Sequence, residues 1–415
     1  MDKKQEIIEL LKKYNQEHII KFLEKLEDEK QAELIKQIEK INFEQIIELY
    51  ESTKKKIEFK ENKIEPLKYL DKAKLTDAQR KQFEKLGETT IRAGEYAVVT
   101  MAGGQGTRLG HKGPKGTFKL DVCETGKHLF EILVDNLQEA NQKYGVTIPW
   151  YIMASQENKA ETIAFLERNN YFGYNKNYVT IFTQNQLPLL DINGKLLIGK
   201  DLKIKEASDG NGGTYAALRT SGCLADMKNR GIKWIFIGAI DNVLLKMVDT
   251  IFLGMAKSQN TQIATKSVVK ANPHERVGIL ARMNGRPKVI EYTELPTKMA
   301  EEYDENGELK YGEAHIMCNL YTIEAIEKIS KETLMYHIAY KKNSYIDEKG
   351  KEIIPEEPNS YKFEAFIFDA FEFFDDIAIL RGKREEDFAP VKNKEGVDSP
   401  ETAKELYENF LKNKI

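Results

Sequence analysis

The sequence has few cysteines and no long apolar run, and both absences limit what the protein can be. Its three cysteines, Cys123, Cys223 and Cys318, lie far apart in a chain of 415 residues and follow no metal-binding or disulfide spacing. Such cysteines are typical of small buried side chains in a reducing compartment. No apolar stretch reaches the length that crosses a bilayer, and residues 1–14 are rich in lysine and glutamate. The sequence therefore predicts a cytoplasmic protein with no membrane partner.

An excess of charge of one sign is also missing. The chain has 63 lysines and arginines against 66 aspartates and glutamates, which leaves a formal net charge of −3. This balance argues against a general nucleic-acid binder, so any basic site must be local. No Ser-His-Asp or Cys-His arrangement for nucleophilic catalysis is evident either. Composition alone therefore leaves an enzyme or a binding protein.

Hydrophobic periodicity divides the chain into three predicted regions. Residues 1–90 show apolar positions at helical spacing, and Thr76 with Gln79 predicts a capped helix that ends at Gly87. Residues 91–385 are predicted to form the catalytic domain, and residues 386–415 a short C-terminal segment.

Strands and helices alternate in the first part of the predicted catalytic domain. Strands are expected at 150–153, 178–182 and 234–240, with helices at 158–168 and 215–230 between them. This alternation indicates an α/β fold with a mixed, mostly parallel sheet flanked by helices. Ligands of such sheets bind at the carboxyl ends of the strands.

A glycine-rich loop directly follows the first of these strands. The β-branched run at 96–100 is followed by GGQGTRLG at 103–110 and PKG at 114–116. Glycines let the backbone approach a ligand closely, and free amides can surround phosphate oxygens. Arg108 and Lys115 supply the positive charge that a triphosphate requires. The loop therefore predicts a nucleotide site.

Two common nucleotide loops are excluded. The glycines give G-x-G-x-x-x-G rather than the G-x-G-x-x-G of dinucleotide-binding folds, and no Gly-Lys-Ser or Gly-Lys-Thr occurs for a P-loop. The alternative to a nucleotide site is a glycine-rich turn whose two cations are solvated and bind no ligand.

The loop resembles the signature of the UTP-dependent sugar-1-phosphate uridylyltransferases. The sequence SDGNGG at 208–213 resembles the second loop of that family, with Ser208 in place of proline. Further similarity lies in IDN at 240–242, VIEY at 289–292 and FAPVKN at 388–393. The segments QEH at 16–18 and NFE at 42–44 look like the UDP-N-acetylhexosamine pyrophosphorylase branch, and the similarity extends from about residue 15 to about 400.

The resemblance implies a Rossmann-like, GT-A-like nucleotidyltransferase sheet and a specific reaction. UTP and N-acetylglucosamine-1-phosphate would give UDP-N-acetylglucosamine and pyrophosphate, with Mg²⁺ or Mn²⁺ as cofactor. Two alternatives remain: a uridylyltransferase that uses glucose-1-phosphate or several sugars, and a non-catalytic UDP-sugar sensor. A monomer or weak dimer is expected.

The resemblance also implies roles for individual residues. The catalytic residues would be Arg108, Lys115 and Lys392, and the metal ligand Asp241. Nucleotide binding would fall to Ala102, Gly103, Gly104, Gln184, Gly210 and Asn211, with Gln186 as an alternative to Gln184. The sugar would be bound by Asn211, Glu291, Tyr292, His315, Lys362, Phe366 and Phe368. For Phe366 and Phe368 a place in the core is an equal alternative, and Asp241 with Asn242 alternatively caps a helix.

Two features depart from the family pattern. His315 stands where an asparagine that touches the sugar is expected, which leaves the choice among N-acetylglucosamine, N-acetylgalactosamine and glucose open. Longer family members also carry a β-rich C-terminal module beyond the part that corresponds to residue 400.

Overall fold

The computed structural model describes residues 3–54 and 62–414. They form two compact units, one made of Met1–Lys60, Asn185–Gly213 and Leu334–Phe366, the other of Glu61–Gln184, Thr214–Thr333 and Ile367–Ile415. These units do not follow the predicted boundaries at residues 90 and 385. The reason is that the chain leaves the larger unit twice, after Gln184 and after Thr333, and contributes both excursions to the smaller one.

The first unit combines the N-terminal helices with short antiparallel strands. The helices are α1 (Lys3–Lys13), α2 (His18–Leu23), α3 (Asp28–Glu39) and α4 (Phe43–Lys54). The strands are β8 (Gln186–Pro188), β9 (Leu190–Asp191), β10 (Glu206–Ser208), β16 (His337–Lys341), β17 (Tyr345–Ile346), β18 (Glu352–Ile353) and β19 (Ser360–Glu364). Apolar helix residues such as Leu11 and Ile38 share one core with Leu190 and Phe363. The helical stripes of the N-terminal segment are therefore core, as expected from their spacing.

The amide side chains of two glutamines fix these helices to the strand segment. Gln16 accepts a hydrogen bond from the amide of Leu196 and donates one to the carbonyl of Gly194, both at 2.9 Å. Gln37 binds both backbone groups of Ile204 in the same way, at 2.9 and 2.8 Å. An amide suits this task because it offers a donor and an acceptor side by side.

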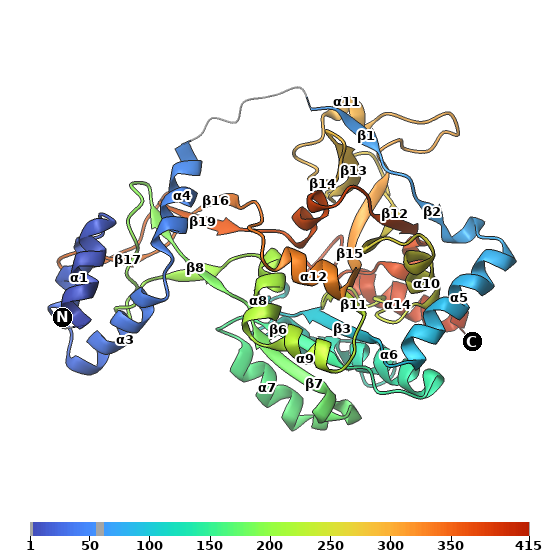
Figure 1. Ribbon diagram of the computed structural model, residues 1–415, viewed down its shortest axis with the longest axis horizontal. Coiled ribbons are helices and arrows are strands. Elements are labelled where there is room, and N and C mark those ends of the chain that lie inside the picture. Colours follow the sequence, from blue (N-terminus) through green and yellow to red (C-terminus); the bar gives the residue numbers. More distant parts are fainter. Residues whose placement is uncertain (1–2, 55–61, 415) are drawn as a thin grey trace. The chain divides into compact units, whose positions relative to one another are not determined.

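The second unit is built on one large mixed sheet (Figure 1). Its strands are β1 (Ile64–Pro66), β2 (Leu70–Asp71), β3 (Tyr96–Met101), β6 (Trp150–Ala154), β7 (Val179–Thr183), β11 (Trp234–Ala239), β12 (Ile263–Val269), β13 (Ile279–Met283), β14 (Arg286–Ile290), β15 (Glu313–Thr322) and β20 (Ala378–Arg381). The order β2-β20-β12-β15-β11-β3-β6-β7 is parallel except around β15, which pairs antiparallel with β11 and β12. The predicted mixed, mostly parallel sheet is confirmed.

Helices flank this sheet. They are α5 (Asp77–Arg92), α6 (Leu129–Tyr144), α7 (Lys159–Arg168), α8 (Thr214–Thr220), α9 (Cys223–Asn229), α10 (Thr250–Ser258), α11 (Thr297–Ala300), α12 (Ile323–Ile329), α13 (Arg384–Asp387) and α14 (Pro400–Lys414), with a small hairpin of β4 (Lys119–Leu120) and β5 (Lys127–His128). None of the helices in the described ranges combines the length and apolar composition needed to cross a bilayer.

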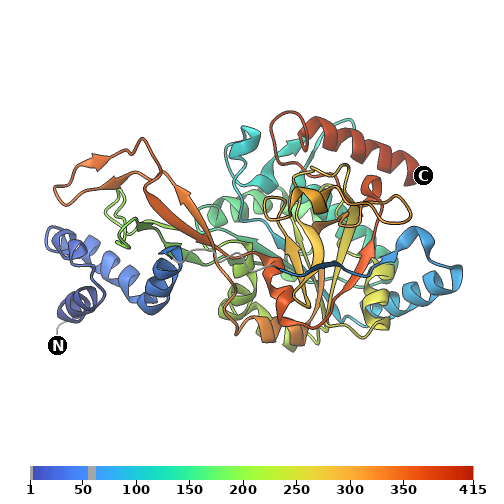
Figure 2. The same cartoon turned by 90° about the horizontal axis from the view of Figure 1, so that it is seen from above.

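Two glycines bring α5 and α10 into direct backbone contact. The capping box of Thr76 and Gln79 opens α5 as predicted, but the helix runs to Arg92, so the predicted end at Gly87 is wrong. A Cβ at Gly87 would overlap the backbone of Thr250, and a Cβ at Gly254 would overlap that of Phe83. Figures 1 and 2 show the two helices side by side. Gly87 is therefore a packing residue rather than a helix stop.

One other predicted helix also differs from the structure. The helix expected at 215–230 is broken into α8 and α9 at Gly222, whose φ of 82° is left-handed. Left-handed backbone overrides helical spacing at this place. Farther along the chain, β19 ends at Glu364 and is followed by a 3₁₀ helix at Ile367–Phe373.

Candidate active site

Four neighbouring strands of the large sheet, β11, β3, β6 and β7, run parallel and end at the same edge. The glycine-rich loop follows β3, Gln184 follows β7 and Asp241 closely follows β11. The glycine-rich loop and Asp241 each follow a predicted strand, and the structure places both at the carboxyl ends of parallel strands, together with Gln184.

The glycine-rich loop folds back on itself. The amide of Lys115 donates to the carbonyl of Gly104, and that of Gly106 to the carbonyl of Gly113, both at 3.0 Å. Within the described residues, the amides of Gly103 and Gly104 have no hydrogen-bond partner. The turn thus brings Lys115 beside two backbone donors, which suits an anionic ligand.

The glycines of this loop are required for different reasons. A Cβ at Gly103 would lie 2.8 Å from Oε1 of Gln184, and one at Gly106 would lie 2.8 Å from the ring of His111. Nothing lies within 4 Å of a Cβ built on Gly104. Gly110 has a φ of 71°. Only Gly104 therefore leaves an open approach, whereas the others serve packing or backbone shape.

Asn158 supports the loop and was missed as a site residue by the sequence analysis. It is fully buried, accepts a hydrogen bond from the amide of Ser155 at 2.8 Å, and donates to the carbonyl of Ala102 at 3.2 Å. The amide of Ala102 also donates to the carbonyl of Met153, at 2.8 Å. Both backbone groups of Ala102 are therefore engaged, and its contribution is to fix the start of the loop. The spacing Ser155-x-x-Asn158 at a helix start was the available signal.

The predicted triphosphate and metal residues meet at the centre of this edge. Nζ of Lys115 lies 3.1 Å from Oδ2 of Asp241, and the two side chains are 15% and 21% exposed. Arg108 lies in an exposed 3₁₀ turn at Thr107–Leu109. The structure therefore pairs Lys115 with Asp241 and leaves Arg108 facing solvent.

The C-terminal segment that carries Lys392 also reaches this point. The amide of Val391 donates to the carbonyl of Asp241 at 2.8 Å. Lys392 itself is 42% exposed in its side chain and lies 3.5 Å from Asp398. The predicted catalytic lysine thus follows a residue bonded directly to the predicted metal ligand, although they are about 150 positions apart in the sequence.

His315 is buried at the start of β15, on the same edge of the sheet. Its Nε2 lies 3.0 Å from Oδ1 of Asn319, and its ring packs edge-on against Phe368 and Phe371, with centroids 5.6 and 5.8 Å away. Burial lowers the pKa of His315 to about 4, so its ring is neutral near pH 7. The histidine therefore brings no charge to the position of the expected asparagine.

Of the remaining predicted sugar residues of the second unit, Glu291 and Tyr292 directly follow β14 and Phe368 lies in the 3₁₀ helix at Ile367–Phe373. Glu291 is half-buried, and its amide donates to the side chain of Glu294 at 3.2 Å. Tyr292 is 46% exposed. Phe368 is 8% exposed and belongs to the packing around His315.

The first unit holds the other predicted residues. The loop with Gly210 and Asn211 packs against Ala365, whose amide donates to the carbonyl of Asp209 at 2.8 Å and whose carbonyl accepts from Gly212 at 2.8 Å. Phe366 follows Ala365 and packs against His337, with ring centroids 4.6 Å apart and ring planes tilted by 36°. Lys362, on β19, lies 2.8 Å from Glu364. Gln186, the alternative to Gln184, belongs to β8 and pairs with Ser208.

No group of three or more His, Cys, Asp or Glu side chains that could hold a metal occurs among the residues that the structure describes. A lone carboxylate at Asp241 still fits Mg²⁺, because this ion accepts one or two carboxylates and takes its other ligands from phosphates and water.

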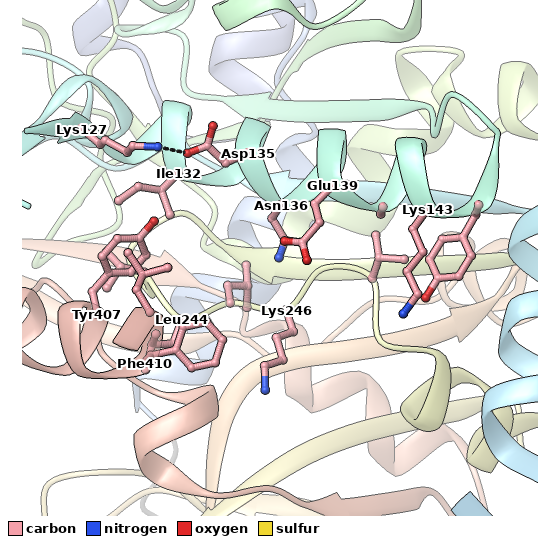
Figure 3. Close-up of a pocket in the computed structure, with 16 residues that line it drawn as sticks. Lys127, Ile132, Asp135, Asn136, Glu139, Lys143, Leu244, Lys246, Tyr407 and Phe410 are labelled. Atoms are coloured by element: carbon pink, nitrogen blue, oxygen red, sulfur yellow. Dashed lines mark hydrogen bonds and ion pairs between the residues drawn. The ribbon is translucent and has the colours of Figure 1, made fainter. Parts of the chain in front are cut away.

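A separate cavity of about 370 Å³ is lined in part by the loop that follows Asp241 (Figure 3). It is lined by α6, by residues 243–248 and by α14, and it includes the Lys127–Asp135 ion pair. None of the predicted site residues lines this cavity. It is therefore distinct from the site at the glycine-rich loop.

Comparison with known proteins agrees with the fold and the loop. A family model described as UTP–glucose-1-phosphate uridylyltransferase matches residues 40–397. The UDP-N-acetylglucosamine pyrophosphorylase of Saccharomyces cerevisiae is 39% identical over 338 residues, which cover 79% of this chain and 71% of the yeast protein. The UDP-N-acetylglucosamine diphosphorylase 2 of Arabidopsis thaliana is 36% identical over 350 residues, covering 80% of this chain and 68% of the plant protein.

A solved structure is similar over almost the whole chain. The uridine diphosphate N-acetylglucosamine pyrophosphorylase of Trypanosoma brucei, crystallised with an inhibitor, gives a TM-score of 0.81 at 31% identity and covers 98% of this chain and 84% of that chain. From the matched family model, these identities and the shared fold, the chain belongs to the UTP–glucose-1-phosphate uridylyltransferase family, and its relatives within that family include UDP-N-acetylglucosamine pyrophosphorylases.

Proposed function

We propose that this protein is a uridylyltransferase that converts UTP and N-acetylglucosamine-1-phosphate to UDP-N-acetylglucosamine and pyrophosphate. One observation carries the proposal: the amides of Gly103 and Gly104, the Lys115–Asp241 pair and the Lys392 segment converge on one edge of the sheet. Relatives that are 36–39% identical bear the name of this activity.

The chemistry requires positioning and charge neutralisation rather than a nucleophilic side chain. An oxygen of the sugar phosphate attacks the α-phosphorus of UTP, and pyrophosphate leaves in line. The sugar phosphate is already ionised at pH 7, so no general base is needed. The loop amides and Lys115 would hold the triphosphate, with Arg108 as a further cation from the exposed turn.

The half-buried Lys115 and Asp241 bear on how the site is prepared. The side chains of Lys115 and Asp241 are only 15% and 21% exposed. Their opposite charges offset part of the desolvation cost of this burial before substrate binds. Phosphate oxygens would then compete with Asp241 for Lys115, which leaves the carboxylate available to a cation. Asp241 would hold Mg²⁺ or Mn²⁺, which would supply positive charge to the triphosphate.

Uracil would be recognised beside the loop. Gln184 is 6% exposed, and its Oε1 faces Gly103. A primary amide pairs with both a carbonyl and an N–H of uracil, so Gln184 suits this base better than Gln186, which lies within β8. In the first unit Gly210 and Asn211 are assigned to the nucleotide and sugar, and Lys362 and Phe366 to the sugar. In the second unit Glu291, Tyr292, His315 and Phe368 are assigned to the sugar.

The second candidate keeps the reaction but uses glucose-1-phosphate. The description of the matching family model favours it, and His315 replaces the asparagine expected at the sugar. Purified protein with UTP, Mg²⁺ and each sugar-1-phosphate distinguishes the candidates by pyrophosphate release. Release with N-acetylglucosamine-1-phosphate well above that with glucose-1-phosphate supports the main proposal, and equal release contradicts it. No release with any sugar indicates a UDP-sugar sensor.

The metal assignment has its own experiment. Asp241→Ala is expected to abolish both activity and the dependence on Mg²⁺ concentration, and isothermal titration of Mg²⁺ with UTP present should lose its binding signal. An unchanged titration would assign the metal to another residue.

A further inference from the structure

Asn242, the residue after the predicted metal ligand, caps no helix among the described residues, since the next helix, α10, begins at Thr250 and is capped by Asp249, so the alternative of a helix cap is wrong. Its side chain makes backbone contacts of another kind. Its Nδ2 donates to the carbonyl of Asp387 at 2.7 Å, and its Oδ1 accepts from the amide of Ala389 at 2.8 Å. Oδ1 also accepts from the amide of Leu244 at 3.2 Å. The side chain is 2% exposed. The buried side-chain amide of Asn242 thus gives this segment, which leads to Lys392, the donor and acceptor that a neighbouring strand would otherwise provide.

The backbone on both sides of Asn242 extends this pairing. The amide of Val243 donates to the carbonyl of Ala389 at 3.1 Å, and that of Val391 to the carbonyl of Asp241 at 2.8 Å. An antiparallel bridge joins Asn242 to Pro390. The chain on either side of Pro390 is therefore held in a fixed register against Asp241.

A buried ion pair anchors the start of the same segment. Nζ of Lys266, on β12, lies 2.8 Å from Oδ1 of Asp387 and 2.7 Å from Asp249. The side chains of Lys266 and Asp387 are 1% and 2% exposed. Beyond Asn242, residues 243–248 line the cavity of Figure 3, where Lys246 points away from Asn136 and Glu139. The segment from Asp387 to Lys392 is thus fixed to the sheet at one end and to Asn242 in the middle.

We infer that Asn242 is a positioning residue that sets the location of Lys392 relative to Asp241, through its paired bonds to Asp387 and Ala389. The inference rests on the proposed function, in which Lys392 and Asp241 act on the same phosphates. The side chain of Lys392 is 42% exposed, and its Nζ lies 3.5 Å from Asp398 and 5.4 Å from the ring centroid of Phe388, both long contacts that restrain the side chain weakly. The hydrogen-bonded backbone from Asp387 to Val391 therefore determines where Lys392 lies.

A double-mutant cycle tests the coupling. Asn242→Ala is expected to lower kcat about tenfold in the wild-type background but less than about threefold in the Lys392→Ala background, because residues that act through one another are not additive. The ratio of kcat to KM for UTP should change in the same way as in Lys392→Ala. Equal losses in both backgrounds overturn the inference, since a purely structural defect would multiply with the loss of the lysine.

Two variants separate the hydrogen bonds from the volume of the side chain. Asn242→Asp keeps the shape and the acceptor toward Ala389 but loses the donor toward Asp387. Asn242→Ser keeps a hydroxyl that is too short to reach both groups, and it serves if the other variants do not fold. Losses close to that of Asn242→Ala are expected, whereas activity near wild type in either variant contradicts the inference.

A control and a second readout keep the inference independent of the proposed reaction. Asn141 accepts a hydrogen bond from the amide of Ile148 at 3.0 Å, away from the site, and Asn141→Ala should stay within about twofold of wild type. Hydrogen exchange at Ala389 and Val391 should accelerate in Asn242→Ala and not in Lys392→Ala. Unchanged exchange overturns the inference even if the wild type proves inactive, and an inactive wild type with accelerated exchange contradicts only the proposed function.

Discussion

The two glycine-rich loops of this protein are alike in glycine content but differ in how far their glycines leave the backbone open. In the loop at 103–110, a Cβ on Gly104 would meet nothing within 4 Å. In the loop at 208–213, Cβ atoms on Gly210 and Gly212 would overlap the backbone of Ala365, and one on Gly213 would overlap the carboxylate of Asp209. The first loop keeps a side of its backbone available to a ligand, and the second uses its glycines to let two chain segments touch. Composition alone does not distinguish these uses.

The largest effect is expected from Gly210→Ala, which tests the packing role of the second loop. Its φ of 87° disfavours alanine, and the added methyl would overlap the carbonyl of Ala365. We expect a loss of about 3 kcal/mol or more in the free energy of unfolding, measured by urea denaturation. Gly222→Ala is the matched control, since its φ is 82° with nothing within 4 Å. It should cost only about 1 kcal/mol, and equal losses would attribute the whole effect to backbone strain.

Lys115→Ala tests the opposite role of the first loop. Removing one preorganised cation should lower kcat/KM by at least about a hundredfold while the unfolding free energy changes by less than about 1 kcal/mol. Lys112, an exposed lysine of the same loop, provides the control, and Lys112→Ala should retain nearly full activity. If both variants lose activity equally, the loop contributes only general positive charge.

His315 tests whether the start of β15 is closely packed, like the loop at 208–213, or accessible to a ligand, like the loop at 103–110. Because burial lowers its pKa to about 4 from 6.5, the unfolded chain binds a proton that the folded protein rejects between these values. Stability should therefore fall as the pH drops from 6.5 to 4, by up to roughly 3 kcal/mol from this residue.

His315→Asn should remove that part of the acid dependence, measured by urea denaturation at several pH values. His274→Asn, at an exposed histidine, is measured beside it to control for the substitution itself. His18, whose pKa burial also lowers, retains its own contribution in both variants. An unaltered slope in His315→Asn would mean that the ring is accessible to water and available to a ligand.

Gly104→Ala should have the smallest effect on the fold and a measurable effect on binding. With open space around the new methyl, the unfolding free energy should stay within about 0.5 kcal/mol of wild type. The methyl would occupy the side from which a ligand approaches, so the Kd for UTP should rise about tenfold in calorimetric titration. Unchanged affinity would show that the nucleotide does not contact this backbone.

The sequence predicted those parts of the molecule whose determinants are local. The strand before Gly103 and the strand before Asp241 were recognised by their β-branched and apolar residues, and the parallel order then placed both loops on one edge. Helical stripes such as Ile7 and Leu11 likewise identified core residues.

What the sequence could not reveal depends on partners far along the chain. Gly87 looks like a helix stop unless Thr250 is known to press against it, and Asn158 and Asn242 look like ordinary caps until their distant carbonyls are located. The two-unit division was missed for the same reason, because the segments at 185–213 and 334–366 join residues 1–60 only in three dimensions.

The crossing of α5 and α10 has a consequence for how this chain can change over generations. A methyl group at Gly87 or at Gly254 would overlap the backbone of the opposite helix. A substitution at either glycine cannot be rescued by trimming a neighbouring side chain, because the obstacle is main chain. Single substitutions of Gly87 or Gly254 are therefore disfavoured, and a larger side chain at either position would fit if both helices moved apart together.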